Sequence, residues 1–254
     1  MHAAVAVLCA GGVLMVAGCG GGAKASAATI DKAAVATRAK GSEHFQLSGY
    51  VVAVGHKVPL SGMGDFKNRP APGSGSFSLS IDAGATPVQV KTVLDGTTMY
   101  LSSPVLSTLL PKGKTWGSVD LRKAARLEGI DLGQISESSP SNVLTMIAST
   151  GSVTKLGTGT VDGVKATHYR ATIDLSKVPG GAKLEQQTGA TTEPYDVWIG
   201  PNDMVVRVTE NTKLDGATSS TTIELSRFGE PVVVQVPSSA ETIDITKLAT
   251  GGKP

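Results

Sequence analysis

The chain has 254 residues, and 23 Lys and Arg against 21 Asp and Glu give a formal net charge of +2. A charge so close to neutral supplies no broad basic surface, so we expect no nucleic-acid partner. Hydrophobic residues make up 40% of the chain and aromatic residues only 4%, so the core must be mainly aliphatic. This hydrophobic share excludes a generally disordered chain, and the scarcity of rings disfavours a surface that stacks on bases or sugars.

The chain begins with a run that is typical of an export signal. Residues 3–16 are apolar and carry no charge. A membrane-spanning helix needs about 20 such residues, so the run is too short to cross a bilayer and matches the hydrophobic part of a secretory signal peptide. Only Met1 and His2 precede the run, so the basic residues that are usual there are absent. We predict that residues 1–18 form a lipoprotein signal peptide.

The run ends in Val16-Ala17-Gly18-Cys19, which resembles the lipobox of bacterial lipoproteins. The small residues before the cysteine would let a signal peptidase reach the backbone, and the Cys19 thiol would carry a diacylglyceryl thioether. Two acyl chains hold a protein stably on a membrane, whereas one is marginal. The alternative is a cysteine that happens to end an ordinary signal peptide. We predict a lipid attachment at Cys19, palmitate being a typical acyl group, and a location on the outer face of the cell membrane, in the cell envelope.

The remaining sequence offers no catalytic centre. Cys9 lies in the signal, so the mature chain keeps one cysteine and has neither a disulfide nor a CxxC site. The three histidines beyond the signal do not have metal-ligand spacing, and no GxSxG motif occurs. Isolated acidic residues form no evident pair for acid–base catalysis; among them are Glu185, Glu193 and Glu210. We therefore expect no catalytic residue, no metal and no cofactor.

The mature chain is expected to consist of a tether and one domain. Residues 19–29 contain the lipidated cysteine and a Gly/Ala/Ser-rich tether, and residues 30–250 form a single lipid-binding-like domain. A short helix is predicted over residues 30–40, with Asp31 as its N-cap.

From Phe45 onward the hydrophobic period changes to two, which is typical of strands. Strands are predicted at 45–51, 77–81, 88–94, 97–101, 115–121, 153–160, 165–175, 195–199, 204–209, 221–228 and 232–236. Asp-Gly pairs at 95–96, 162–163 and 215–216 lie between such runs and predict tight hairpins. Successive hairpins without long crossovers indicate an antiparallel meander.

Two apolar segments interrupt the strands. Residues 104–110 begin with a proline that suits the first turn of a helix, and residues 140–149 place Val143, Leu144 and Ile147 on one helical face. A third helical stretch ends the segment 176–188. The predicted fold class is therefore β-rich α+β: a large curved antiparallel sheet, a half-open barrel, with a few helices on its concave side.

Three segments can be compared with a known family: residues 140–175 (PSNVLTMIASTGSVTKLGTGTVDGVKATHYRATIDL), 195–208 (YDVWIGPNDMVVRV) and 228–244 (FGEPVVVQVPSSAETID). With these segments and the lipobox, the chain resembles the LppX/LprA/LprF/LprG family of actinobacterial lipoproteins. The resemblance implies a half-open barrel similar to LolA and LolB, with an apolar cavity between the sheet and the helices. It also implies a protein that binds and moves multi-acylated envelope lipids.

Acyl chains suit an aliphatic lining, because each buried methylene gains about 0.8 kcal/mol without a polar partner. The predicted lining residues are Phe77, Leu79, Ile81, Val105, Leu109, Val143, Leu144, Ile147, Met204, Val206, Val208, Ile223 and Leu225. The helices at 105–110 and 143–147 would act as lids over an apolar mouth. The alternative reading is that these helices simply plug the sheet.

The sequence thus predicts an envelope lipoprotein that carries or chaperones an acylated (glyco)lipid without catalysis. Its expected partners are the membrane through the acyl anchor, the lipid ligand and a membrane transporter. The alternative is a sensor or protein-interaction lipoprotein on the same scaffold, with a collapsed cavity. A hydrolase is a more distant alternative.

Overall fold

The computed structural model describes residues 23–25, 27–53, 55–69, 72–82, 84, 86–127, 144, 147, 151–177, 181–214 and 217–250. The predicted signal peptide, the lipobox and Cys19 lie outside the described residues, as does Val143. Among the described residues, no helix is both long and apolar enough to span a membrane.

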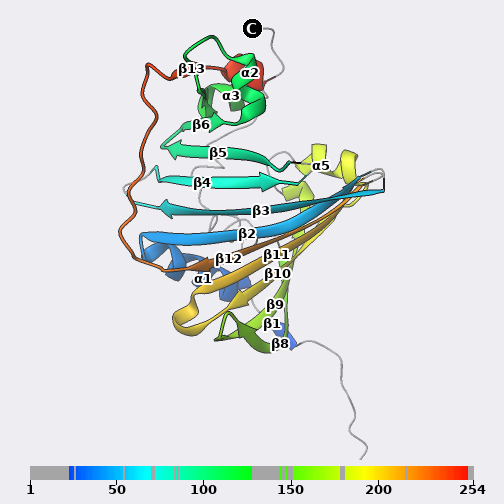
Figure 1. Cartoon of the computed structure of the whole chain (residues 1–254). Coiled ribbons are helices and arrows are strands. Elements are labelled where there is room, and N and C mark those ends of the chain that lie inside the picture. Colours follow the sequence, from blue (N-terminus) through cyan, green and yellow to red (C-terminus); the bar gives the residue numbers. More distant parts are fainter. Residues whose placement is uncertain are drawn as a thin grey trace, which may run out of the picture.

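Thirteen strands form one curved sheet in the order β1-β8-β9-β10-β11-β12-β2-β3-β4-β5-β6-β7-β13 (Figure 1). Every pairing is antiparallel except that of β13 with β7, so the predicted antiparallel sheet is confirmed. The strands are β1 (Ala23–Ala25), β2 (Ser42–Ala53), β3 (His56–Lys67), β4 (Ser74–Ile81), β5 (Val88–Asp95), β6 (Thr98–Ser102), β7 (Trp116–Asp120), β8 (Gly151–Val161), β9 (Val164–Asp174), β10 (Thr192–Ile199), β11 (Val205–Leu214), β12 (Ala217–Ser226) and β13 (Thr242–Asp244).

Two of the predicted hairpin turns are confirmed. Asp95-Gly96 leads from β5 into β6, and Asp162-Gly163 joins β8 to β9. Gly96 has a φ of 61°, and Asp162 and Gly163 have φ values of 45° and 79°. Asp162-Gly163 thus has the two consecutive positive φ values of one type of tight hairpin turn, and the first turn has a single positive φ at Gly96, as in another type. The third pair, at 215–216, lies outside the described residues.

Most of the described helices lie in one of two regions of the molecule. The described helices are α1 (Ala27–Ala39), α2 (Pro104–Leu109), α3 (Leu121–Leu127), α5 (Gly181–Thr188) and α6 (Thr246–Ala249), with 3₁₀ turns η2 (Leu175–Lys177) and η3 (Pro201–Asp203). Helix α1 packs on one face of the sheet, whereas α2, α3 and α6 gather at the end next to β7 and β13 (Figure 1). The predicted start of α2 is confirmed: Pro104 occupies its first turn, and the Ser103 hydroxyl accepts a hydrogen bond from the Leu106 N–H.

The structure differs from the sequence-based prediction in several places. Asp31, expected as an N-cap, lies within α1, which begins at Ala27. The segment 19–29, expected as a tether, contains β1 and the first turn of α1, so three residues (20–22) separate Cys19 from the sheet. The strand predicted at 232–236 is wrong: this segment crosses the ends of several strands on its way to β13 (Figure 1). Prolines at 231 and 237 flank it and lack the N–H that a strand needs for pairing. Strand β3 escaped prediction because Pro59 and two glycines, Gly62 and Gly64, are weak strand formers.

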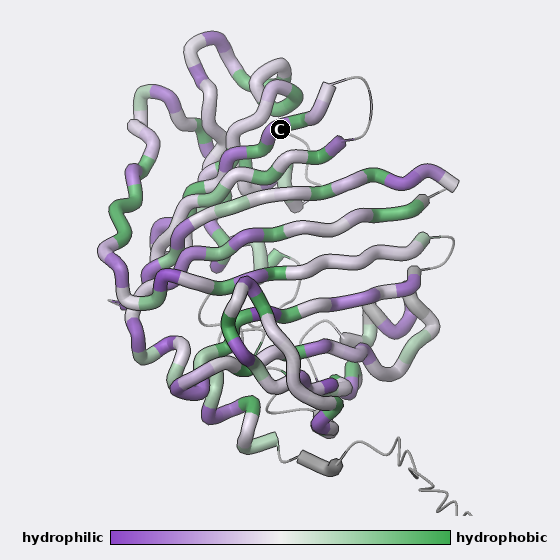
Figure 2. Tube along the Cα trace, turned by 60° about the horizontal axis from the view of Figure 1, so that its bottom comes forward, coloured by the Kyte–Doolittle hydropathy of each residue, from purple (hydrophilic) through white to green (hydrophobic). Residues whose placement is uncertain are grey.

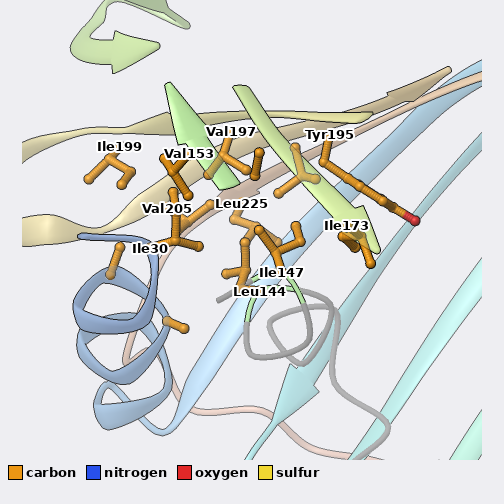
Figure 3. Packing of buried hydrophobic residues seen from close by; sticks show 14 of the residues in the cluster. Ile30, Leu144, Ile147, Val153, Ile173, Tyr195, Val197, Ile199, Val205 and Leu225 are labelled. Atoms are coloured by element: carbon orange, nitrogen blue, oxygen red, sulfur yellow. The ribbon is translucent and has the colours of Figure 1, made fainter. Parts of the chain in front are cut away.

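The main core lies between α1 and the strands β8 to β12 (Figure 3). Ile30, Ala33 and Ala34 of α1 are fully buried, and so are Leu144 and Ile147. The Thr37 hydroxyl ties α1 to the sheet: it donates to the Ala33 carbonyl at 2.8 Å and accepts from the Val205 N–H at 3.0 Å. Because that N–H is buried, this hydrogen bond fixes α1 against the start of β11.

Candidate functional site

Alternation along the strands divides the sheet into an inner and an outer face. We define the inner face as the one that carries the core residues Phe45, Val197 and Leu225. Strand register places Phe77, Leu79 and Ile81 on this face, and Ser76, Ser78 and Ser80 on the outer face. Figure 2 shows hydrophobic residues interspersed with more polar ones along the strands of the sheet.

A glycine lets two aromatic rings meet on the inner face. Phe45, Gly64 and Phe77 lie opposite one another on β2, β3 and β4. The two phenylalanine rings contact each other with their centroids 5.8 Å apart and an interplanar angle of 59°. A Cβ atom at Gly64 would lie 2.4 Å from the Phe77 Cβ, so a larger residue cannot fit without displacing the strand. The absence of a side chain at Gly64 therefore allows the Phe45 and Phe77 rings to contact each other across β3.

The next rows along β2 to β5 are aliphatic and only half-buried. Leu47, Gly62, Leu79 and Val90 lie opposite one another across four strands, and Ile81 belongs to the following row. We call Leu47, Phe77, Leu79, Ile81 and Val90 the open apolar face. Phe77 is 37% exposed and the other four side chains have intermediate exposure. Side chains that are aliphatic and still partly accessible can bind an apolar ligand, since each methylene removed from water contributes favourably.

The predicted lining residues of the other half of the sheet lie in the core instead. Leu144, Ile147, Val208 and Leu225 belong to the main buried cluster, and Ile223 packs against it (Figure 3). These side chains are covered by α1 and by one another. The predicted inner-face residues therefore separate into an open set and a covered set.

Three predicted lining residues lie away from the inner cluster. Val105 and Leu109 are exposed on α2 at the end of the sheet. Val206 packs in a second cluster with Val161 and Ala166, against Trp198. A bulge between Trp198 and Ile199 pairs Ile199 with Val205 and Trp198 with Arg207, which interrupts the expected alternation at Val206. The remaining predicted residue, Met204, is buried just before β11 but belongs to neither cluster.

The inner face also carries an acidic pair, buried Glu193 and half-buried Glu210, contrary to the expectation of isolated acids. The Thr212 hydroxyl lies 2.8 Å from Glu193 Oε1 and 3.1 Å from Glu210 Oε1, and the Tyr195 hydroxyl donates to Glu210 Oε1 at 3.0 Å. Glu193 and Glu210 are far apart in sequence terms but come together because β10 and β11 form a hairpin in which Tyr195 faces Glu210. The two-residue spacing of Glu193 and Tyr195, which places both side chains on one face of β10, was the signal available in the sequence.

Burial controls the protonation of this cluster. Removal of the Glu193 carboxyl from water raises its pKa, an effect that the hydrogen bond from Thr212 partly offsets and the charge of Glu210 reinforces. Burial, followed by the charge of Glu210, raises the pKa of the Tyr195 hydroxyl well above its ordinary value. Tyr195 therefore stays a neutral hydrogen-bond donor. The cluster gives the aliphatic inner face one polar region, whose hydrogen bonds are made among its own members.

Within the described part of the chain, no three His, Cys, Asp or Glu side chains gather as ligands for a metal ion. On the outer face His168 stacks on Trp198, with ring centroids 4.2 Å apart. Asp196 lies beside this stack and accepts two hydrogen bonds from Arg170. These contacts link β9 to β10 on the side opposite to the open apolar face.

Comparison with solved structures identifies the same architecture in two mycobacterial proteins. LprF of Mycobacterium bovis superposes with a TM-score of 0.53 and 19% identity, over 87% of this chain and 100% of LprF. The lipoprotein LppX of Mycobacterium tuberculosis gives 0.51 and 17%, over 82% of this chain and 97% of LppX. The chain has the fold of LprF and LppX. The half-open sheet implied by the family resemblance is thereby confirmed.

Sequence relatives come from Streptomyces. A 31.2 kDa protein of Streptomyces griseus, from the rplA–rplJ intergenic region, is 28% identical over 156 residues, 55% of this chain and 51% of that protein. A Streptomyces coelicolor protein named as a lipoprotein is 24% identical over 115 residues, 45% of this chain and 35% of its own length. The match thus spans about half of the first relative and about a third of the second. No family model matches the chain.

Proposed function

We propose that this protein is a lipid-anchored envelope protein whose inner face binds an acylated lipid and carries or chaperones it without catalysis. The open apolar face is the observation that supports this function. Its aliphatic side chains remain partly accessible to water, which is unfavourable unless a ligand covers them. The shared fold with the lipoprotein LppX supports the same class of function.

The ligand chemistry follows from the residues of the inner face. Leu, Ile, Val and Phe side chains line it, and the polar atoms of Glu193, Thr212 and Tyr195 are concentrated on β10 and β11. Acyl chains need no polar partner and gain about 0.8 kcal/mol for each methylene that they bury. We infer that acyl chains lie over β2 to β5 and that any glycosyl part of the ligand faces away from this surface.

The Val16-Ala17-Gly18-Cys19 sequence supports attachment of acyl groups to Cys19 and retention on the outer face of the cell membrane. The separation of Cys19 from β1 by three residues would hold the β1 end of the sheet close to that membrane. A membrane transporter that supplies or removes the lipid is a further proposed partner.

The experiment for ligand binding compares two substitutions on neighbouring residues of β4. The full-length chain is expressed in a host that exports and acylates lipoproteins, purified in detergent, and its non-covalent lipids are extracted and identified by mass spectrometry. We expect Leu79→Glu to remove most of the co-purified lipid, because a charge on the open apolar face must be desolvated by the acyl chains. Ser78→Glu, on the outer face, should retain the lipid.

Melting curves of both variants show whether the fold is intact. A wild-type protein without bound lipid, or equal lipid content in the two variants, would contradict the binding proposal and favour a protein-interaction role. The anchor is tested separately with Cys19→Ala, which should lose incorporation of labelled palmitate and retention in the membrane fraction.

A further inference from the structure

The end of the molecule formed by α2, α3 and α6 exposes several large aliphatic side chains. Val105 and Leu109 of α2 are 59% and 69% exposed, and Leu127 of α3 is 58% exposed. Leu248 of α6 adds a further 43%-exposed side chain. Helices α3 and α6 contact each other, and α2 and α3 both contact β7, so these residues share one end of the molecule (Figure 1). We call residues 104–127 and 238–250 the helix end.

Helix α2 does not close the core of the protein. None of its six residues is buried, although its start is fixed by Ser103 and Pro104. Val105 and Leu109 are four residues apart and therefore lie on the same side of the helix. A short helix that is held in place and presents aliphatic residues to water is suited to contact with an apolar phase.

The helix end is also basic. Its six basic residues, against three acidic ones, are Lys112, Lys114, Arg122, Lys123, Arg126 and Lys247. Since the whole chain has a net charge of +2, the positive charge is concentrated here and the remaining residues are close to neutral overall. Among the described residues, no ion pair involves Arg122, Arg126 or Lys112.

The three acidic residues of the helix end are engaged in local structure. Asp120 accepts a hydrogen bond from the Lys123 N–H at 3.0 Å, and Asp244 accepts one from the Thr246 N–H at 2.8 Å. Glu241 accepts from the Ser238 hydroxyl at 2.8 Å. These carboxylates hold turns and helix starts, and among the described residues none of them forms an ion pair with Arg122 or Arg126.

We propose that the helix end is a docking surface for an anionic lipid layer. Val105 and Leu109 would enter the boundary between headgroups and acyl chains, while Arg122 and Arg126 would bind the anionic headgroups. Aliphatic residues bordered by Lys and Arg are the combination that binds such surfaces, and each basic residue near the surface adds to the attraction. The aliphatic residues lie on three separate short helices, which suits a fluid lipid layer that needs no shape complementarity.

The position of the helix end indicates which lipid layer it meets, a step that rests on the proposed anchor at Cys19. The β1 and β13 strands lie at opposite ends of the 13-stranded sheet, about 58 Å apart along its curve at about 4.8 Å per strand (Figure 1). Ala23 follows Cys19 after three intervening residues, and these four Cα–Cα steps can span at most about 14 Å. The helix end is therefore directed toward a lipid surface other than the one that holds the anchor, and the open apolar face lies between the two.

The experiment uses two populations of vesicles. The acylated full-length protein is reconstituted in phosphatidylcholine vesicles, and labelled vesicles of phosphatidylcholine with phosphatidylglycerol are added. We expect the protein to bridge the two populations, and we expect bridging to weaken as the salt concentration rises. Val105→Ser/Leu109→Ser and Arg122→Gln/Arg126→Gln should each lower the amount of captured vesicle by about tenfold.

Matched controls remove aliphatic or basic side chains elsewhere on the surface. Val35→Ser/Val233→Ser and Lys91→Gln/Lys165→Gln, all at exposed positions outside the helix end, should bridge the vesicles as the wild type does. Unchanged melting curves are expected for every variant, because the altered side chains are exposed. Equal capture by the helix-end variants and the wild type, or equal losses in the controls, would overturn the docking surface and leave a protein partner as the alternative.

Failure of the proposed function gives a different result. A protein that is not acylated would leave the neutral vesicles, and flotation of the same variants on the anionic vesicles would then test the helix end directly. Lipid content is measured in parallel, and the helix-end variants should keep their co-purified lipid. A protein that bridges vesicles but carries no lipid would contradict the proposed function and retain the docking surface.

Discussion

The two halves of the sheet use the same alternating pattern with different results. On β8 to β12 the inner face is covered by α1 together with Leu144 and Ile147, and Val197, Val205 and Ile173 are almost fully buried. On β2 to β5 the equivalent positions form the open apolar face, where Leu79, Ile81 and their neighbours are only half-buried. Strand sequence alone does not separate the halves. The difference shows that the position of the helices decides whether an apolar face becomes core or stays accessible.

This comparison explains why the same residue type can have a structural role in one half and a binding role in the other. Covered side chains are removed from water completely when the protein folds, so folding receives the full transfer free energy. Half-exposed side chains still have apolar area in water, and a ligand that covers this area on binding gains the remaining part. The following three predictions test this division, in order of decreasing effect.

Substitution of one isoleucine in each half should give the largest contrast. Ile173→Ala removes methyl and methylene groups from a side chain that is 1% exposed, and we expect the free energy of unfolding to fall by about 3 kcal/mol. Ile81→Ala removes the same atoms from a half-exposed side chain and should cost about 1 kcal/mol or less. Urea unfolding of the two variants measures both values. Similar losses would show that the open apolar face is packed as tightly as the core.

Addition of one methyl group at Gly64 should disturb the contact between Phe45 of the core and Phe77 of the open apolar face. A Cβ there meets the Phe77 Cβ at 2.4 Å and the Ser76 carbonyl oxygen at 2.5 Å, so Gly64→Ala should destabilise the protein by about 2 kcal/mol. At Gly157 nothing lies within 4 Å of the added atom, and Gly157→Ala should leave the stability nearly unchanged. Thermal unfolding of both variants provides the comparison. A harmless Gly64→Ala would mean that β3 and β4 can separate without cost.

The smallest effect is expected from the acidic pair and depends on pH. The pKa of Glu193 is raised in the folded protein, so folding favours its protonated form. The stability of the wild type should therefore fall as the pH rises from the ordinary glutamate pKa through the raised value. Glu193→Gln has no ionisable group at this position. The difference in free energy of unfolding, variant minus wild type, should therefore increase between the two pKa values and become constant at higher pH.

Unfolding curves recorded between about pH 4 and pH 8 check this difference. Glu185→Gln on α5, where burial is intermediate, provides the control and should run parallel to the wild type. If the stability of Glu193→Gln also changes with pH in parallel with that of the wild type, the Glu193 carboxyl is exposed to water and is not buried.

Much of the fold could be predicted from local patterns. Alternation over residues 77–81 located β4, and the Asp-Gly pairs at 95 and 162 located two hairpins. Pro104 gave the start of α2. Each of these signals depends on a few neighbouring residues, whose dihedral preferences act before any tertiary contact forms.

The candidate site was predicted less completely. Phe77, Leu79 and Ile81 lie on the inner face as expected, but Val206 turned to the other face at a bulge, and α2 exposes the Val105 and Leu109 side chains. The pairing of Glu193 with Glu210 depends on the register of two strands, which no short segment specifies. The acyl attachment at Cys19 and the bound lipid stay predictions.

The sequence by itself determined the period-two segments, the turn positions and the aliphatic character of the inner face. It also supplied the cysteine motif that predicts an anchor. Only the tertiary structure decided which part of that face is covered by α1, which rings meet across Gly64 and which basic residues surround the exposed side chains of the helix end. The physical reason is that turn geometry and strand periodicity are local properties of the chain, whereas coverage and register depend on the packing of segments that are far apart in the sequence.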